Sequence, residues 1–181
     1  METFWNSGIA SGNLPDLTGN GHDGVATVTA GVGVNYGIAG KVGNAVQTGV
    51  PGVSHGNFLT DWLGTGLSAV TFHCWAKMDA VGNYPMLFSY GVNANQTLEM
   101  RGNGATGKVS AIDRSNNVGP SIASSVSGDG IFHHFVGTSD GSILQLYMDG
   151  SPLADVSEGC NYLNKIWTYL GNPIHFYVII F

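Results

Sequence analysis

The sequence predicts an all-β protein, an antiparallel β-sandwich, and three observations lead to this prediction. The chain has 181 residues, of which 28 are Gly and only 10% are charged, against roughly 25% in an average domain. Four Lys, two Arg and three Glu are too few to build the solvent-facing sides of helices. Short apolar runs recur along the chain between Gly, Asn or Pro, which is typical of a sandwich or barrel. The length predicts one domain over residues 1–181.

Each expected strand in the first half is a run of β-branched or aromatic residues bounded by turn-forming residues. The longest of them is apolar through its middle, which predicts a central, buried strand. In order, these strands are Thr3–Ile9, Gly24–Thr29, Asn44–Thr48, Ser68–Met78, Tyr84–Tyr90, Thr97–Arg101 and Lys108–Asp113.

The second half repeats the pattern and adds one hairpin signal. Asp149-Gly150 follows an alternating run, so the strand before it is expected to pair with the strand after it. The final run is apolar on both faces and carries no charge, so it must be covered by the sandwich or by another subunit. The expected strands are Ile131–Ser139, Ser142–Met148, Leu153–Ser157, Ile166–Leu170 and Ile174–Phe181.

Four segments in order resemble the laminin-G-like jelly-roll domains of the concanavalin A-like lectin/glucanase superfamily. They are Asp16–Gly24, Gly40–Val46, Val70–Lys77 and Asp129–Gly150. The resemblance implies jelly-roll topology, an antiparallel sandwich that hosts lectins, glycosidases, lyases, adhesion modules and virion proteins. The segment Ile174–Phe181 departs from it, because the family's closing strand carries acidic residues and this one has none.

The loop Asp16–Gly24 contains three Gly and three Asn or Asp residues, which favour a tight turn with positive φ angles. Its side-chain and carbonyl oxygens are the ligands that Ca²⁺ prefers. Asp16, Asn20 and Asp23 are therefore candidate ligands of a structural calcium ion. The alternative is an Asx-rich turn whose side chains accept hydrogen bonds from the loop's own amides.

Histidine and cysteine do not form a recognisable metal pattern. His133 and His134 are adjacent on an expected strand, so their side chains point to opposite faces and cannot bind one ion together. They are expected to be packing residues with backbone partners. Cys74 lies in an apolar strand, and two free thiols, Cys74 and Cys160, are favoured over a disulfide.

Charge and hydropathy exclude several classes of function. A net charge of −6 with six cations spread along the chain argues against a nucleic-acid partner. No run is long enough for a transmembrane helix, so membrane insertion is not expected. The N-terminus lacks the basic and apolar regions of a signal peptide. The expected location is nevertheless extracellular or on the surface of a virion, as the resemblance implies.

An enzyme is not expected. Glycoside hydrolysis requires a pair of carboxyl groups that flank the substrate. The three Glu residues, Glu2, Glu99 and Glu158, have no partner at the spacing used by this fold's hydrolases. A salt bridge or a solvated edge accounts for Glu99 and Arg101.

Two non-enzymatic functions remain. The first is a glycan-binding or adhesion module, in which aromatic rings stack on sugars and Asn, Asp or Gln contact the hydroxyl groups. Its candidate residues are Asp61, Trp62, Tyr84, Tyr90, Asn93, Asn95 and Gln96; Trp75 is expected in the core instead. The second is a structural or decoration protein of a virus or phage particle, with capsid or tail proteins as partners. Self-association into a homo-oligomer stays open.

Overall fold

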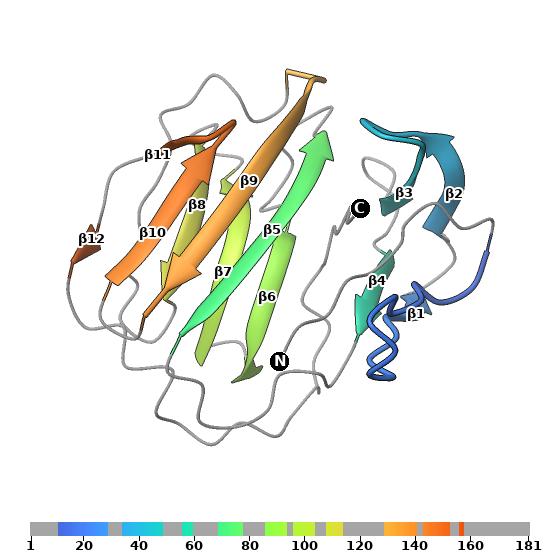
Figure 1. Cartoon of the computed structure of the whole chain (residues 1–181), viewed down its shortest axis with the longest axis horizontal. Helices are drawn as coiled ribbons and strands as arrows, with labels where there is room; N and C mark the ends of the chain where they lie inside the picture. The colour runs from blue at the N-terminus through green and yellow to red at the C-terminus, as the bar shows by residue number, and fades with distance from the viewer. Residues whose placement is uncertain are drawn as a thin grey trace.

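The computed structural model (Figure 1) describes ten stretches of the chain, and every regular element in them is a β-strand. The stretches are 11–28, 34–48, 56–59, 69–77, 86–93, 96–103, 108–113, 129–140, 143–152 and 156–157. Among the described residues, no helix has the length and apolarity needed to cross a membrane. The expected strands Thr3–Ile9, Ile166–Leu170 and Ile174–Phe181 lie outside these stretches, and the single domain over 1–181 stays a prediction.

Two antiparallel sheets form the two layers of the sandwich (Figure 1). The first has the strand order β11-β10-β9-β5, and β12 also pairs with β10. The second has the order β6-β7-β8. The layers approach each other where β10 meets β8 and β5 meets β6. The bounds are β5 Val70–Lys77, β6 Met86–Asn93, β7 Gln96–Asn103, β8 Lys108–Asp113, β9 Phe132–Ser139, β10 Ile143–Met148, β11 Ser151–Pro152 and β12 Val156–Ser157.

Two smaller strand pairs flank the sandwich (Figure 1). Strand β1 (Val25–Val28) pairs with β4 (Gly56–Leu59), and β2 (Val34–Ala39) pairs with β3 (Asn44–Thr48). All these pairs are antiparallel, as predicted for the sandwich.

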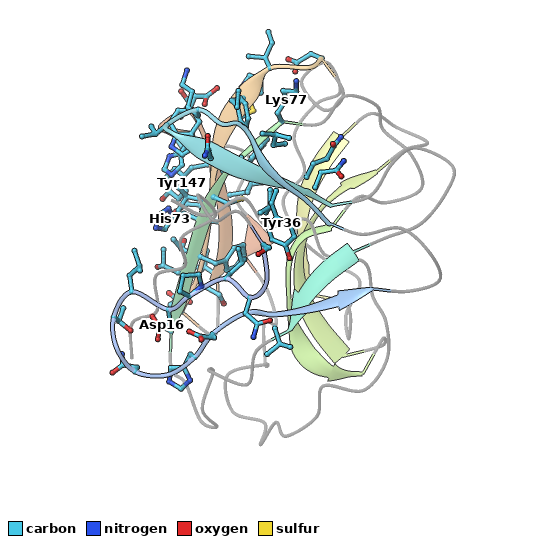
Figure 2. The ribbon with its side chains drawn as sticks, turned by 90° about the vertical axis from the view of Figure 1, so that its right-hand side faces the viewer. Asp16, Tyr36, His73, Lys77 and Tyr147 are labelled. Carbon is cyan, nitrogen blue, oxygen red and sulfur yellow. The ribbon has the colours of Figure 1, made fainter. Side chains whose placement is uncertain are left out.

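Five of the eight buried apolar side chains of the described residues lie on one face of the first sheet, and the others are Leu14, Ala45 and Val46. On β5, Phe72, Cys74 and Ala76 are buried, and on β9 and β10 they meet the fully buried Phe135 and Leu146. Because strand side chains alternate between faces, the neighbouring residues along each strand, such as His73, Trp75 and His134, lie on the opposite face. That face points away from the second sheet, as His73 and Tyr147 show in Figure 2.

One glycine is required by this packing. Gly137 of β9 lies opposite Phe72 of β5, and a β-carbon at Gly137 would overlap two ring carbons of Phe72. The absent side chain therefore makes room for the ring in the core.

Strand prediction succeeded wherever apolar alternation was strong. Asn44–Thr48 and Lys108–Asp113 are confirmed to the residue. Three described strands, β2, β4 and β11, were not predicted. The return strand was expected to begin at Leu153, whereas β11 is Ser151–Pro152. Strand β2 is interrupted by Gly37, whose φ is 69°, and by a shift of register between Asn35 and Ile38. Strand β4 has four residues and begins with Gly, so its pattern is too short to stand out.

Candidate functional site

The loop Asp16–Gly24 is closed by its own hydrogen bonds. Asp16 Oδ1 accepts from the amide and the hydroxyl of Thr18, at 2.9 and 2.7 Å, and Asp16 Oδ2 accepts from the His22 amide at 3.2 Å. Asp23 Oδ1 in turn accepts from the Asp16 amide at 2.8 Å. Gly19 and Gly21 both have φ of 79°. These contacts match the Asx-rich turn.

Calcium at this loop stays a prediction. Ca²⁺ takes six to eight oxygen ligands, and here it would compete with backbone amides for the oxygens of Asp16 and Asp23. Asn20, the third candidate, donates its side-chain amide to the Thr18 hydroxyl at 2.9 Å. Within the described part of the chain, no three His, Cys, Asp or Glu residues gather closely enough to hold a metal ion.

The residues predicted to bind a ligand are only partly described. Asp61, Trp62, Tyr84 and Asn95 lie outside the described residues. Tyr90 lies on β6 opposite Leu98, and Asn93 at the end of β6 faces Gln96 at the start of β7. The hairpin therefore brings the backbones of Asn93 and Gln96 together. That these residues bind a ligand remains a prediction.

A different set of ring and amide side chains gathers on the outward face of the first sheet. We call it the outer row, and it consists of His73 and Trp75 on β5, His134 on β9, and Gln145 and Tyr147 on β10. Strand pairing places Trp75 beside His134, while Val136 lies between His73 and Tyr147. His73 is exposed and the other four are half-buried. Figure 2 shows His73 and Tyr147 directed away from the second sheet.

Three rings of the outer row, those of His73, Trp75 and His134, contact one another. Trp75 and His134 are stacked, with centroids 5.1 Å apart and planes inclined by 29°. The His73 ring meets His134 edge-on, with centroids 5.5 Å apart, and His73 Nδ1 lies 3.4 Å from His134 Nε2. The Tyr147 hydroxyl donates a hydrogen bond to Gln145 Oε1. The row therefore comprises two contacting groups of ring and polar side chains, with Val136 between His73 and Tyr147.

A turn from another part of the chain reaches this row. Between β2 and β3, the Gly40 amide donates to the Gly43 carbonyl at 2.9 Å, and Gly43 has φ of 62°. This turn places Lys41 Nζ 5.2 Å from the centroid of the Trp75 ring. The distance is that of a cation–π contact, so Trp75 is held by both Lys41 and His134.

His133 is clamped between two carboxylates beside the row. Its Nδ1 lies 2.7 Å from Asp149 Oδ2, and its Nε2 lies 3.1 Å from Asp129 Oδ2. Asp149 Oδ1 accepts from the His134 amide at 2.9 Å. Asp149 and Gly150 have φ of 50° and 80° and join β10 to β11 in a two-residue hairpin loop, so their backbone is that of a type I′ turn.

The clamp shifts the pKa of each of its members. Partial burial would lower the pKa of His133, but the hydrogen bonds and charges of Asp149 and Asp129 outweigh burial and raise it. The Ile131 amide, more than any other group, lowers the pKa of Asp129. Burial acts to raise the pKa of Asp149, and the His133 and His134 contacts overcome it, so that pKa is lowered. Both carboxylates and the imidazolium are thus stabilised in charged form.

The pKa of His134 moves the other way. Burial is the largest cause of its lowering, the charge of His73 adds to it, and Asp149 opposes it. The two adjacent histidines therefore differ in chemistry, with His133 favoured as a cation and His134 as a neutral ring.

Two expectations about these residues are corrected and two are confirmed. His133 and His134 do point to opposite faces, but the ring of His133 contacts carboxylates rather than the backbone. Trp75 is on the outward face, not in the core, because Cys74 occupies the buried position beside it. The period-two alternation of β5 was the signal that could have placed Trp75 correctly. Cys74 is a free thiol as predicted, and burial raises its pKa to about 12. Cys160 lies outside the described residues.

Fold and site together define a jelly-roll β-sandwich with an aromatic and polar surface on one sheet. A laminin G-type family model, described as the concanavalin A-like lectin/glucanases superfamily, matches residues 49–172. This match covers more than half of the 181 residues, and the chain belongs to this superfamily. It includes Val70–Lys77 and Asp129–Gly150, while Asp16–Gly24 and Gly40–Val46 precede it. Comparisons with curated proteins and with solved structures give no significant match.

Proposed function

We propose that this domain is a non-catalytic recognition module that binds carbohydrate through the outer row. The observation that carries the proposal is the outer row itself, five ring and amide side chains on three neighbouring strands. Membership of a lectin-containing superfamily supports it. As in other laminin G-like domains, the setting would be extracellular, at a cell surface or on a particle.

The chemistry of the row suits a sugar. Half-buried Trp and Tyr side chains combine an apolar ring with a polar tip, so they can contact the C–H face and the hydroxyl groups of one residue. Trp75 is fixed by Lys41 and His134, which reduces the conformational entropy lost on binding. His73 supplies a hydrogen-bonding group beside Trp75 and His134, and Gln145 supplies another beside Tyr147.

The row does not suit glycoside hydrolysis. Cleavage needs two carboxyl groups on opposite sides of the scissile bond, and the described residues of the outward face include neither Asp nor Glu. The carboxylates of Asp129 and Asp149 are both hydrogen-bonded to the His133 ring. Glu99 belongs to β7 of the other sheet. We therefore expect no release of reducing ends from polysaccharides, and Glu99→Gln should leave binding unchanged.

The test is a glycan array followed by calorimetry with two matched double variants. His73→Ala/Gln145→Ala removes polar groups of the row, while Asn93→Ala/Gln96→Ala removes those of the β6–β7 hairpin. Two neutral hydrogen bonds contribute about 1–3 kcal/mol, so the row variant should bind about 5- to 150-fold more weakly. The hairpin variant should bind like the parent.

Three results would contradict the proposal in different ways. Loss of binding in the hairpin variant alone would move the site to Asn93 and Gln96. Cleavage of the bound polysaccharide would refute the non-catalytic role. A symmetric oligomer that retains no glycan would favour the alternative role as a structural or decoration protein of a particle.

A further inference from the structure

The two histidines of the outer row form a pair whose ring nitrogens face each other. His73 lies on β5 opposite Val136, and His134 lies on β9 opposite Trp75. The two side chains are therefore diagonal neighbours on one face of the sheet, within reach of each other. His73 Nδ1 and His134 Nε2 are 3.4 Å apart.

The contact is a long hydrogen bond, and its length also suits two ligands of a shared metal ion. An N–H donor usually lies about 2.7–3.2 Å from its acceptor. Zinc binds imidazole nitrogen at about 2.0–2.1 Å in tetrahedral geometry, which places two ligating nitrogens about 3.3 Å from each other. The pair thus has the spacing of two adjacent zinc ligands without movement of the backbone.

We propose that His73 Nδ1 and His134 Nε2 bind one divalent transition-metal ion of the Zn²⁺, Ni²⁺ or Cu²⁺ class. The exposed His73 gives the ion a path from solvent, and water completes the coordination shell. Stacking on Trp75 holds the His134 ring in place before the ion arrives, which is the positioning that a metal site needs. Imidazole favours these ions over Mg²⁺ and Ca²⁺, which prefer oxygen ligands.

The neighbouring charged groups have other partners, so the contact that an ion would replace is the hydrogen bond between the two rings. Each imidazole then keeps its proton on its other ring nitrogen. Asp149 and Asp129 are hydrogen-bonded to His133 on the opposite side of β9. The Lys41 ammonium lies over the ring of Trp75. Two protein ligands leave coordination positions open, so an added donor can enter, as in sites that keep a water position. This site goes beyond carbohydrate recognition and is tested without any sugar.

The test is calorimetric titration of the full chain with ZnCl₂ and with CuSO₄, in a buffer that does not bind metals. We expect binding to both ions, tighter for Cu²⁺ as the Irving–Williams order requires, and no heat of binding with MgCl₂. His73→Ala and His134→Gln should each weaken Zn²⁺ binding at least about tenfold, the smallest loss typical when even an outer partner of a metal ligand is removed. His22→Ala, which removes an imidazole from the Asp16–Gly24 loop, is the matched control and should change nothing.

Circular dichroism and melting in the absence of metal establish that each variant is folded. Because His73 is exposed, His73→Ala should fold normally even if His134→Gln does not. One Zn²⁺ per chain, or one per two chains with both histidines required, supports the site. Absence of Zn²⁺ binding, or binding that survives both substitutions, overturns it.

Discussion

Substituting Gly137 by Ala should destabilise the sandwich through a single steric contact. The added β-carbon would overlap Cζ and Cε2 of Phe72, and even the third-nearest atom, Cε1, would lie only 3.0 Å away. Carbon atoms in normal contact are about 3.5–4.0 Å apart. Phe72 is only 5% exposed, so its ring has no room to swing into solvent.

Two effects of opposite sign compete in this variant. Replacing Gly by Ala in a compatible backbone stabilises a protein by about 0.4–1 kcal/mol, through the entropy of the unfolded chain. Overpacking a core costs about 1–3 kcal/mol, and here the clash involves a buried ring. We expect the clash to win, lowering the melting temperature by roughly 2–4 °C for each kcal/mol lost in a chain of this size.

The assay is a double-mutant cycle measured by chemical denaturation. Phe72→Leu removes the ring carbons that the new methyl group would meet, so Gly137→Ala should cost little or become stabilising in that background. The coupling between the two sites should exceed about 1 kcal/mol, within the range found for residues in contact. A Gly137→Ala protein as stable as the parent, or additive effects in the cycle, would refute this account of the core.

Three further predictions concern charge, burial and metal. Because the pKa of His133 is raised in the folded protein, its ion pairs stabilise fully below about pH 6.5 and weaken as pH rises through the folded-state pKa. Because the pKa values of Asp129 and Asp149 are lowered, the same stabilisation is lost as pH falls below about 3.8. The loss of unfolding free energy in Asp149→Asn should therefore be largest between these limits, and a pH-independent loss would contradict it. In a Cys160→Ser background, Cys74 should resist thiol reagents at pH 8 until the protein is denatured, because its pKa is about 12; rapid native labelling would disprove this. If calcium binds at Asp16, chelator lowers the melting temperature, and an unchanged curve with no metal by mass spectrometry removes that site.

Most of the described strands could be predicted from the sequence because its strong signals are local. Alternating apolar residues and turn-forming residues located most strands of both sheets, and Asp149-Gly150 identified its hairpin correctly. Strand β2 escaped because Gly37 and a shift of register break the alternation. Such an interruption is stabilised by pairing with β3, which no local pattern reveals.

The site was harder to predict because it depends on contacts between distant segments. Lys41 and Trp75 are 34 positions apart, and His73 and His134 are 61 apart. Nothing in the local sequence links either residue of a pair to its partner. The face of Trp75 could have been derived from Cys74 and strand alternation, but the clamp on His133 needed the pairing of β9 with β10.

The hydrogen bonds of the Asp149 carboxylate limit which mutations the outer row can accept. Because this carboxylate contacts both the His133 ring and the His134 amide, it reinforces the facing of β9 that pairing with β5 and β10 sets. Inserting or deleting one residue in this part of β9 would reverse the facing of the residues that follow, exposing Phe135 and burying polar groups. Redesign of the outer row is therefore restricted to substitution at alternate positions, and within that limit its chemistry can be changed without rebuilding the core.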